Sequence, residues 1–199
     1  MLDAQQALER LKQGNEAFVR EDSHSPYLGG QLRRILASGQ APFAVIVGCS
    51  DSRIPVEMVF HQGLGDLFVV RVAGNVVHHT QLGRIEFGVD VLGAKLVVVM
   101  GHERCGAVDA CLNMIAAPEA NLSEHLNTIV DIIKPSAAKA SGETDREIAL
   151  NNAIKFNVEA NVQRIIDNSE IMAKHVGSGK VKVIGAHYEL SSGRVEFFD

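Results

Sequence analysis

The chain has no tryptophan, few aromatic residues and only three cysteines among its 199 residues. A small, odd number of cysteines does not build the disulfide framework of a secreted scaffold, so we expect reduced thiols. No run of about 18 apolar residues is present, and we therefore expect no membrane span. The net charge of −5 offers no basic surface for nucleic acid. Because the first residues also lack the features of a signal peptide, we expect a cytoplasmic protein.

Length and composition favour one globular unit. A chain of 199 residues with 46% hydrophobic and 22% charged residues is large enough to bury a substantial core. It contains no internal repeat, no low-complexity tract and no linker that would divide it. We therefore expect a single domain over 1–199, in which an N-terminal helical arm over 1–38 precedes an α/β core over 39–199.

Short apolar runs alternate with helical periodicity along the core. The runs predict strands over 43–48, 67–72, 95–100 and 181–186, and the stretch 193–198 is typical of a hairpin return strand. Helical patterns cover 3–20, 31–37, 83–93, 106–117, 122–134 and 144–176. This alternation predicts an α/β fold, with a parallel sheet flanked by helices and a C-terminal antiparallel edge strand.

Two motifs follow the first and third predicted strands. Cys-Ser-Asp-Ser-Arg occupies 49–53, and Gly-His-Glu-Arg-Cys-Gly occupies 101–106. Ligands of parallel sheets bind beyond the carboxyl ends of the strands, so the motifs meet in space if these two strands are neighbours.

Together the motifs provide two thiolates, an imidazole and a carboxylate, a complete ligand set for one tetrahedral ion. The candidate ligands are Cys49, Asp51, His102 and Cys105. Zinc is the expected ion, although cobalt suits the same set. Either motif alone is equally compatible with a buried cysteine and a surface ion pair; their joint occurrence favours a metal site. The third cysteine, Cys111, lies on an apolar helical stretch and is interpreted as a core residue.

These motifs resemble those of the β-class carbonic anhydrases. Segments 66–71, 73–75, 83–87, 185–188 and 193–197 also follow the order and spacing of that family, so the resemblance covers nearly the whole chain. It implies a zinc ion, one per chain, held by Cys49, His102 and Cys105, with Asp51 and Arg53 as a catalytic pair. The implied reaction is the reversible hydration of CO2 to bicarbonate and a proton by zinc-bound hydroxide.

The resemblance further implies a substrate pocket and an assembly. Gln40, Phe68, Phe87 and Gly106 match substrate-binding positions, and the expected partners are CO2 or bicarbonate and further copies of the chain, as a dimer or tetramer with active sites at the dimer interface. Some members regulate the site through a bicarbonate pocket with a tryptophan, an arginine and a tyrosine. Here Ile46 stands at the tryptophan position, although Arg71 matches the arginine. Whether Asp51 rests on zinc or on Arg53 stays open.

Other functions share parts of this pattern. Hydrolases of carbon disulfide or carbonyl sulfide carry similar motifs, and a non-catalytic relative would keep the zinc ligands. The presence of the Asp51–Arg53 pair argues against a purely structural zinc site. A redox thiol enzyme would need a C-x-x-C pair, which the sequence lacks.

Overall fold

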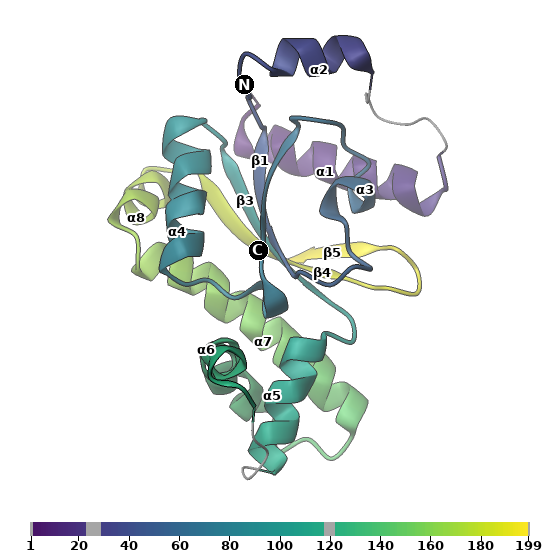
Figure 1. Ribbon diagram of the computed structural model, residues 1–199, viewed down its shortest axis with the longest axis vertical. Helices are drawn as coiled ribbons and strands as arrows, with labels where there is room; N and C mark the ends of the chain where they lie inside the picture. The colour runs from purple at the N-terminus through teal and green to yellow at the C-terminus, as the bar shows by residue number, and fades with distance from the viewer. Residues whose placement is uncertain (1, 23–28, 118–121, 199) are drawn as a thin grey trace.

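A five-stranded sheet with helices on both faces forms the centre of the protein, whose computed structural model describes residues 2–22, 29–117 and 122–198 (Figure 1). The strands are β1 (Ala44–Gly48), β2 (Leu67–Arg71), β3 (Leu96–His102), β4 (Lys182–Tyr188) and β5 (Val195–Phe198). Their order is β2-β1-β3-β4-β5, with β5 antiparallel to β4 and the other neighbours parallel. The predicted fold class is therefore confirmed, including the antiparallel strand at the carboxyl-terminal edge.

Strands β1 and β3 explain why two of the apolar runs are continuous. Every residue of β1 and β3 is buried, because helices cover both faces of the sheet at this point. The strands pair in parallel from Ala44 opposite Leu96 to Gly48 opposite Met100. The expectation that the first and third strands are neighbours is thus correct. His102 was expected just past its strand, but β3 runs two residues further than predicted and includes it.

Helices flank the sheet on its two faces. They are α1 (Ala4–Val19), α2 (Gly30–Leu36), α3 (Val56–Val59), α4 (His79–Glu86), α5 (Gly106–Ala116), α6 (Glu124–Ala140), α7 (Arg146–Asp167) and α8 (Glu170–Gly177), with a 3-10 turn η1 (Ala73–Asn75) and a π-helical segment η2 (Phe87–Val91). No described helix is both long enough and apolar enough to cross a membrane.

Two helical predictions needed correction. The pattern over 144–176 is two helices, because Ser169 interrupts it and caps α8 by accepting a hydrogen bond from the Met172 N–H at 3.1 Å. Helix α6 was expected to end at 134, before a proline, yet it continues through Pro135. Its buried face continues as well, with Ala137 and Ala140 in the core, so tertiary packing outweighs the lost backbone hydrogen bond.

Alternate residues of the inner strands point into two apolar clusters. On one face Ile46 and Val98 pack with side chains of α1, α3, α5 and α6. On the other face Val45 and Val97 pack with α4, η2, α8 and the second half of α7. Figure 1 shows this division, with α4 and α8 on one side of the strands and α1 and α3 on the other.

Helix α1 is joined to this body by a buried amide. Asn15 is 6% exposed. Its Nδ2 donates to the carbonyl oxygens of Val59 at 3.1 Å and Gly193 at 2.8 Å, and its Oδ1 accepts from the Val195 N–H at 2.9 Å. The inner face of α1 lies in the same apolar cluster as β1 and β3. The first helix is therefore fixed to the turn of the last hairpin.

Close packing of α7 and β5 on β4 predicts a stability effect. A Cβ added at Gly185 would lie 2.4 Å from a ring atom of Phe198 and 2.9 Å from Val158. We expect Gly185→Ala to lower the free energy of unfolding by about 1–3 kcal/mol, because rigid neighbours must move. Gly177→Ala is the control, since no heavy atom lies within 4 Å of its added Cβ. Equal urea midpoints for both variants would contradict the packing described here.

Candidate metal centre

Three buried side chains converge at the carboxyl ends of the inner strands. The ligand atoms of Cys49, His102 and Cys105 all lie within 4.8 Å of one another. The residues are 5%, 0% and 0% exposed, respectively. Zinc binds such atoms at about 2.0–2.3 Å, so small side-chain shifts bring all three to a single ion. The chain thus places three of the four predicted ligands in position to bind a metal.

The register of the sheet produces this convergence. Cys49 follows the last residue of β1, and His102 is the last residue of β3, the adjacent strand. Arg104 takes a left-handed φ of 54°, which turns the chain so that Cys105 becomes the N-cap of α5. The turn is anchored to the end of β4, because the Glu103 N–H donates to the Tyr188 carbonyl at 2.9 Å. Residues distant in sequence therefore meet through strand pairing and a single turn.

The imidazole of His102 is oriented to act as a metal ligand. Its Nδ1 lies 2.9 Å from the Glu103 carbonyl oxygen, which can only accept a hydrogen bond, so Nδ1 carries the proton. The other nitrogen, Nε2, then presents a lone pair and is buried without a hydrogen-bond partner. A buried orphan acceptor facing two thiols is the arrangement expected of a metal ligand whose second nitrogen is fixed by a backbone carbonyl.

Neighbouring groups shift the pKa values of the two thiols in opposite directions. The side chain of Cys105 lowers the pKa of Cys49, and the backbone N–H groups of Asp51 and Gly74 add to this shift, while burial opposes it. The side chain of Cys49 raises the pKa of Cys105, and burial adds to that shift. A bound metal ion would hold both sulfurs as thiolates.

Backbone and arginine contacts fix the loop that carries Cys49. The Gly74 N–H donates to Cys49 Sγ at 3.2 Å. Arg71 donates through Nε to the Cys49 carbonyl at 3.0 Å and through Nη2 to the Asp51 carbonyl at 2.6 Å. From the sequence, Arg71 is recognised only as a match to the arginine of a regulatory pocket. The contact between Gly74 and Cys49 could not be predicted, because it depends on how η1 folds back onto the loop.

Asp51 lies beside the ligand set but is bound to Arg53. The guanidinium donates to both carboxylate oxygens, at 2.9 and 2.7 Å, and the Arg53 backbone N–H adds a third bond at 3.0 Å. These bonds from Arg53 hold the pKa of Asp51 well below its usual range. Oδ2 of Asp51 is 3.9 Å from Nε2 of His102. The fourth predicted ligand is thus close to the cluster and held off it by a fork-shaped ion pair.

Two of the expected substrate-binding residues contact each other. The ring centroids of Phe68 and Phe87 lie 6.0 Å apart, and Phe87 is 44% exposed. Gly106 begins α5, next to Cys105, and has open space at the position of a Cβ.

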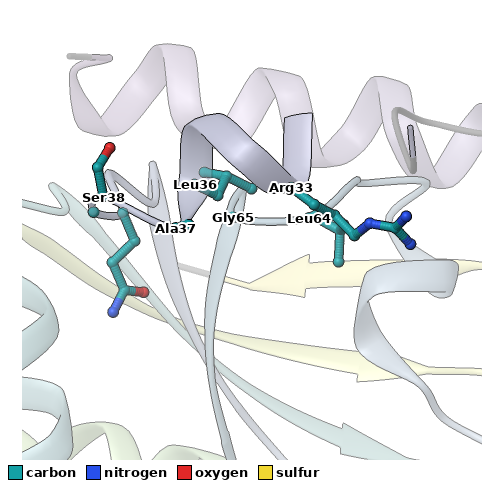
Figure 2. Close-up of a pocket in the computed structure, with 8 residues that line it drawn as sticks. Arg33, Leu36, Ala37, Ser38, Leu64 and Gly65 are labelled. Atoms are coloured by element: carbon teal, nitrogen blue, oxygen red, sulfur yellow. The ribbon is translucent and has the colours of Figure 1, made fainter. Parts of the chain in front are cut away.

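Gln40 lies elsewhere in the protein. It lines a hollow of about 680 Å³ between α2 and the loop at 64–65, and the three candidate ligands are not among its lining residues. Figure 2 shows Leu36 of α2 above Gly65 in this hollow. Within one copy of the chain, Gln40 therefore does not line the space beside Cys49, His102 and Cys105.

Comparison with known proteins identifies a family that the sequence resembles. Residues 44–195 match the family model for carbonic anhydrase. The chain is 37% identical to carbonic anhydrase 2 of Mycobacterium tuberculosis over 194 residues, which cover 97% of this chain and 92% of the relative. It is 38% identical to a carbonic anhydrase of Mycolicibacterium smegmatis over 193 residues, covering 96% and 91% of the two chains.

Solved structures give the same result. One of two tetrameric β-carbonic anhydrases from Sordaria macrospora superimposes with a TM-score of 0.76 at 25% identity, covering 94% of this chain and 93% of the other. A Coccomyxa β-carbonic anhydrase solved in complex with acetazolamide gives a TM-score of 0.74 at 27% identity, covering 96% and 84% of the two chains.

The cluster predicts that metal content distinguishes the cysteines. We expect Cys105→Ser to lose stoichiometric metal, because a buried hydroxyl is a much weaker zinc ligand than a thiolate. Cys111→Ser is the matched control: this thiol is also buried, but it faces the Val130 carbonyl, and burial raises its pKa to about 11. Atomic absorption on purified proteins measures both. Full metal content in Cys105→Ser would refute its role as a ligand.

Proposed function

The chain belongs to the β-carbonic anhydrase family, and from that premise we propose that it catalyses the reversible hydration of CO2 to bicarbonate and a proton. The observation that carries this proposal is the buried Cys49–His102–Cys105 cluster with an arginine-bound carboxylate beside it. We propose zinc as the ion, one per chain, because two thiolates and an imidazole are donors that zinc favours. Zinc bound at this position supplies a water-derived nucleophile near neutral pH.

Asp51 is proposed as the group that accepts a hydrogen bond from the reacting water and thereby orients it. Its carboxylate is adjacent to the ligand cluster, with Oδ2 3.9 Å from His102 Nε2. Because the hydrogen bonds from Arg53 hold the pKa of Asp51 below its usual range, the carboxylate stays ionised and can accept a hydrogen bond at neutral pH. An acceptor fixed in this way orients the oxygen lone pair of the water toward CO2.

Arg53 is proposed as the residue that keeps this carboxylate available for catalysis. Its guanidinium donates one hydrogen bond to each carboxylate oxygen of Asp51, so Arg53 fixes the orientation of the carboxylate. Arg53 Nη2 also donates to the Arg104 carbonyl at 3.2 Å, in the turn between the second and third candidate ligands. The pair is thereby tied to both ligand-bearing segments. If Asp51 moved to the metal instead, the site would have four protein ligands, as in structural zinc sites.

A second copy of the chain is proposed to complete the substrate pocket. Phe68 lies on β2, the edge strand of the sheet, and its neighbour Phe87 is substantially exposed. Met58 and Leu64 are exposed as well, at 64% and 41%. Gln40 lies away from the cluster of its own chain. A homo-oligomer in which this apolar edge is covered would bring such residues to a small CO2 pocket. One solved relative is described as tetrameric.

The free thiols of this chain suit the cytoplasm, which we propose as the location of the protein.

Stopped-flow measurement of CO2 hydration by the zinc-loaded protein tests the proposed activity. We expect the turnover number to rise with pH through the neutral and alkaline range, because the nucleophile forms by loss of a proton from water. Asp51 does not cause this rise, since its lowered pKa keeps it ionised across that range. Absence of hydration by fully zinc-loaded protein would refute the function. A rate that peaks in acid would refute the mechanism.

Removal of the arginine tests the role of the ion pair. We expect Arg53→Ala to reduce turnover about a hundredfold, because Asp51 loses the two side-chain bonds that orient it. Zinc content is expected to stay stoichiometric, since Arg53 is not one of the three clustered ligands. The control is Arg20→Ala, which removes an exposed arginine paired loosely with Glu16 at 3.8 Å. Full activity in zinc-loaded Arg53→Ala would show that the pair is not catalytic.

A further inference from the structure

The turn that carries Gly74 lies between Cys49 and helix α7, because it contacts the Cys49 sulfur through one peptide group and Asn157 of α7 through the next. Gly74 and Asn75 both adopt left-handed conformations, with φ of 65° and 45°. Glycine adopts this conformation without a steric penalty, and asparagine is one of the few other residues that adopt it readily. A Cβ at Gly74 would lie 2.7 Å from Ile133 and 3.2 Å from Ala107, so the position requires glycine for space as well as for φ. This conformation directs the Gly74 N–H at Cys49 Sγ.

Two buried asparagines of α7 hold the opposite side of the same turn. Asn157 Nδ2 donates to the Gly74 carbonyl at 2.8 Å. Asn161 Oδ1 accepts from the Val77 N–H at 2.8 Å, and its Nδ2 donates to the Asn157 backbone carbonyl at 2.8 Å and to Asn157 Oδ1 at 3.2 Å. Both side chains are 1% exposed. The segment from 74 to 77 is therefore bound to α7 at each end.

The backbone groups at the two ends determine which way each amide points. A backbone N–H at Val77 requires the oxygen of Asn161 to face it, which turns the Asn161 amine toward Asn157. That amine requires the oxygen of Asn157, which leaves the Asn157 amine facing the Gly74 carbonyl. Asparagine, with a donor and an acceptor on the same group, fits both positions, whereas aspartate would place an oxygen against a carbonyl or against another oxygen.

These amides are an unusual choice for the face on which they lie. Their neighbours on the buried side of α7 include Ala153, Ile154 and Val158, which contribute to the apolar clusters. Burial of an amide costs free energy unless it is hydrogen-bonded, and here the partners are supplied by the turn that contacts the thiolate. Apolar side chains would pack α7 against the sheet equally well but would leave the turn unheld.

We propose that Asn157, oriented by Asn161, is a positioning residue for the metal centre, which acts by holding the Gly74 N–H on Cys49 Sγ. The hydrogen bond withdraws charge from the sulfur and fixes its direction, so it tunes the charge that this ligand donates to the ion. The inference rests on the metal-binding part of the proposed function and does not depend on CO2 being the substrate.

Cobalt-substituted protein provides a readout that a purely structural residue would not change. In Asn157→Ala we expect the sulfur-to-cobalt charge-transfer band to move to lower energy, because the sulfur retains more charge without the N–H bond. Transfer of the metal to a chelator is expected to be about tenfold faster. The matched control is Asn15→Ala, which removes another buried amide that donates to backbone carbonyls, at Val59 and Gly193, neither of which belongs to the Gly74 turn or to the ligand-bearing segments.

Both variants are expected to lose thermal stability, but only Asn157→Ala is expected to alter the cobalt spectrum. An unchanged band and an unchanged rate of metal loss in folded Asn157→Ala would overturn the proposal and leave Asn157 with a packing role. If that variant does not fold, Asn161→Ala is measured in the same way, since it keeps Asn157 but removes the partner that orients it; a wild-type spectrum there overturns the proposal too.

A measurement on the unmodified chain is independent of both variants. In protein loaded with cadmium-113, a hydrogen bond from Gly74 to a metal-bound Cys49 sulfur should transmit scalar coupling between the Gly74 amide proton and the metal. Loss of this coupling in Asn157→Ala or Asn161→Ala would support the proposal. An uncoupled Gly74 amide in folded, cadmium-loaded wild-type protein would refute it. Wild-type protein that binds no metal would instead refute the proposed function.

Discussion

The parallel register between β1 and β3 is the constraint on which the site depends. Gly48 lies opposite Met100, so the residue after β1 and the last residue of β3 reach the same edge of the sheet. Both strands are buried on both faces, which makes this register costly to change, because a shift by one residue would exchange the residues of the two apolar clusters. The metal site is therefore positioned by the fully buried centre of the sheet, and only the short turn to Cys105 is added to it.

Buried sulfur charge is the second determinant of the arrangement. Two thiolates donate more charge to an ion than imidazoles do, and burial disfavours that charge unless donors or cations compensate it. The backbone N–H of Gly74 and the two bonds from Arg71 to the loop around Cys49 act on the ligand segment. The Asp51–Arg53 pair lies outside the ligand set, next to His102, and keeps a carboxylate within reach of the chemistry. In the proposed enzyme, Cys49, His102 and Cys105 bind the ion, while Asp51 and Arg53 orient the reacting water.

Much of this could be predicted from the sequence because the informative patterns are local. Continuous apolar runs identified the strands, and the polar residues directly after two of them identified Cys49, His102 and Cys105. What could not be predicted depends on contacts between distant segments. The bond from Asn157 to Gly74 joins residues 83 positions apart and follows no spacing rule. The continuation of α6 through Pro135 and the break before α8 reflect packing and capping that outweigh local preference. The position of Gln40 away from the cluster follows from the path of α2, which no motif specifies.

X-ray absorption at the zinc edge of the purified protein tests the central claim most directly, because it counts the donor atoms around the ion. Ligation by Cys49, His102 and Cys105 predicts two sulfur atoms at about 2.3 Å together with nitrogen or oxygen donors at about 2.0–2.2 Å. A spectrum without sulfur, with one sulfur or with four would contradict the assignment of Cys49, His102 and Cys105 as the ligands.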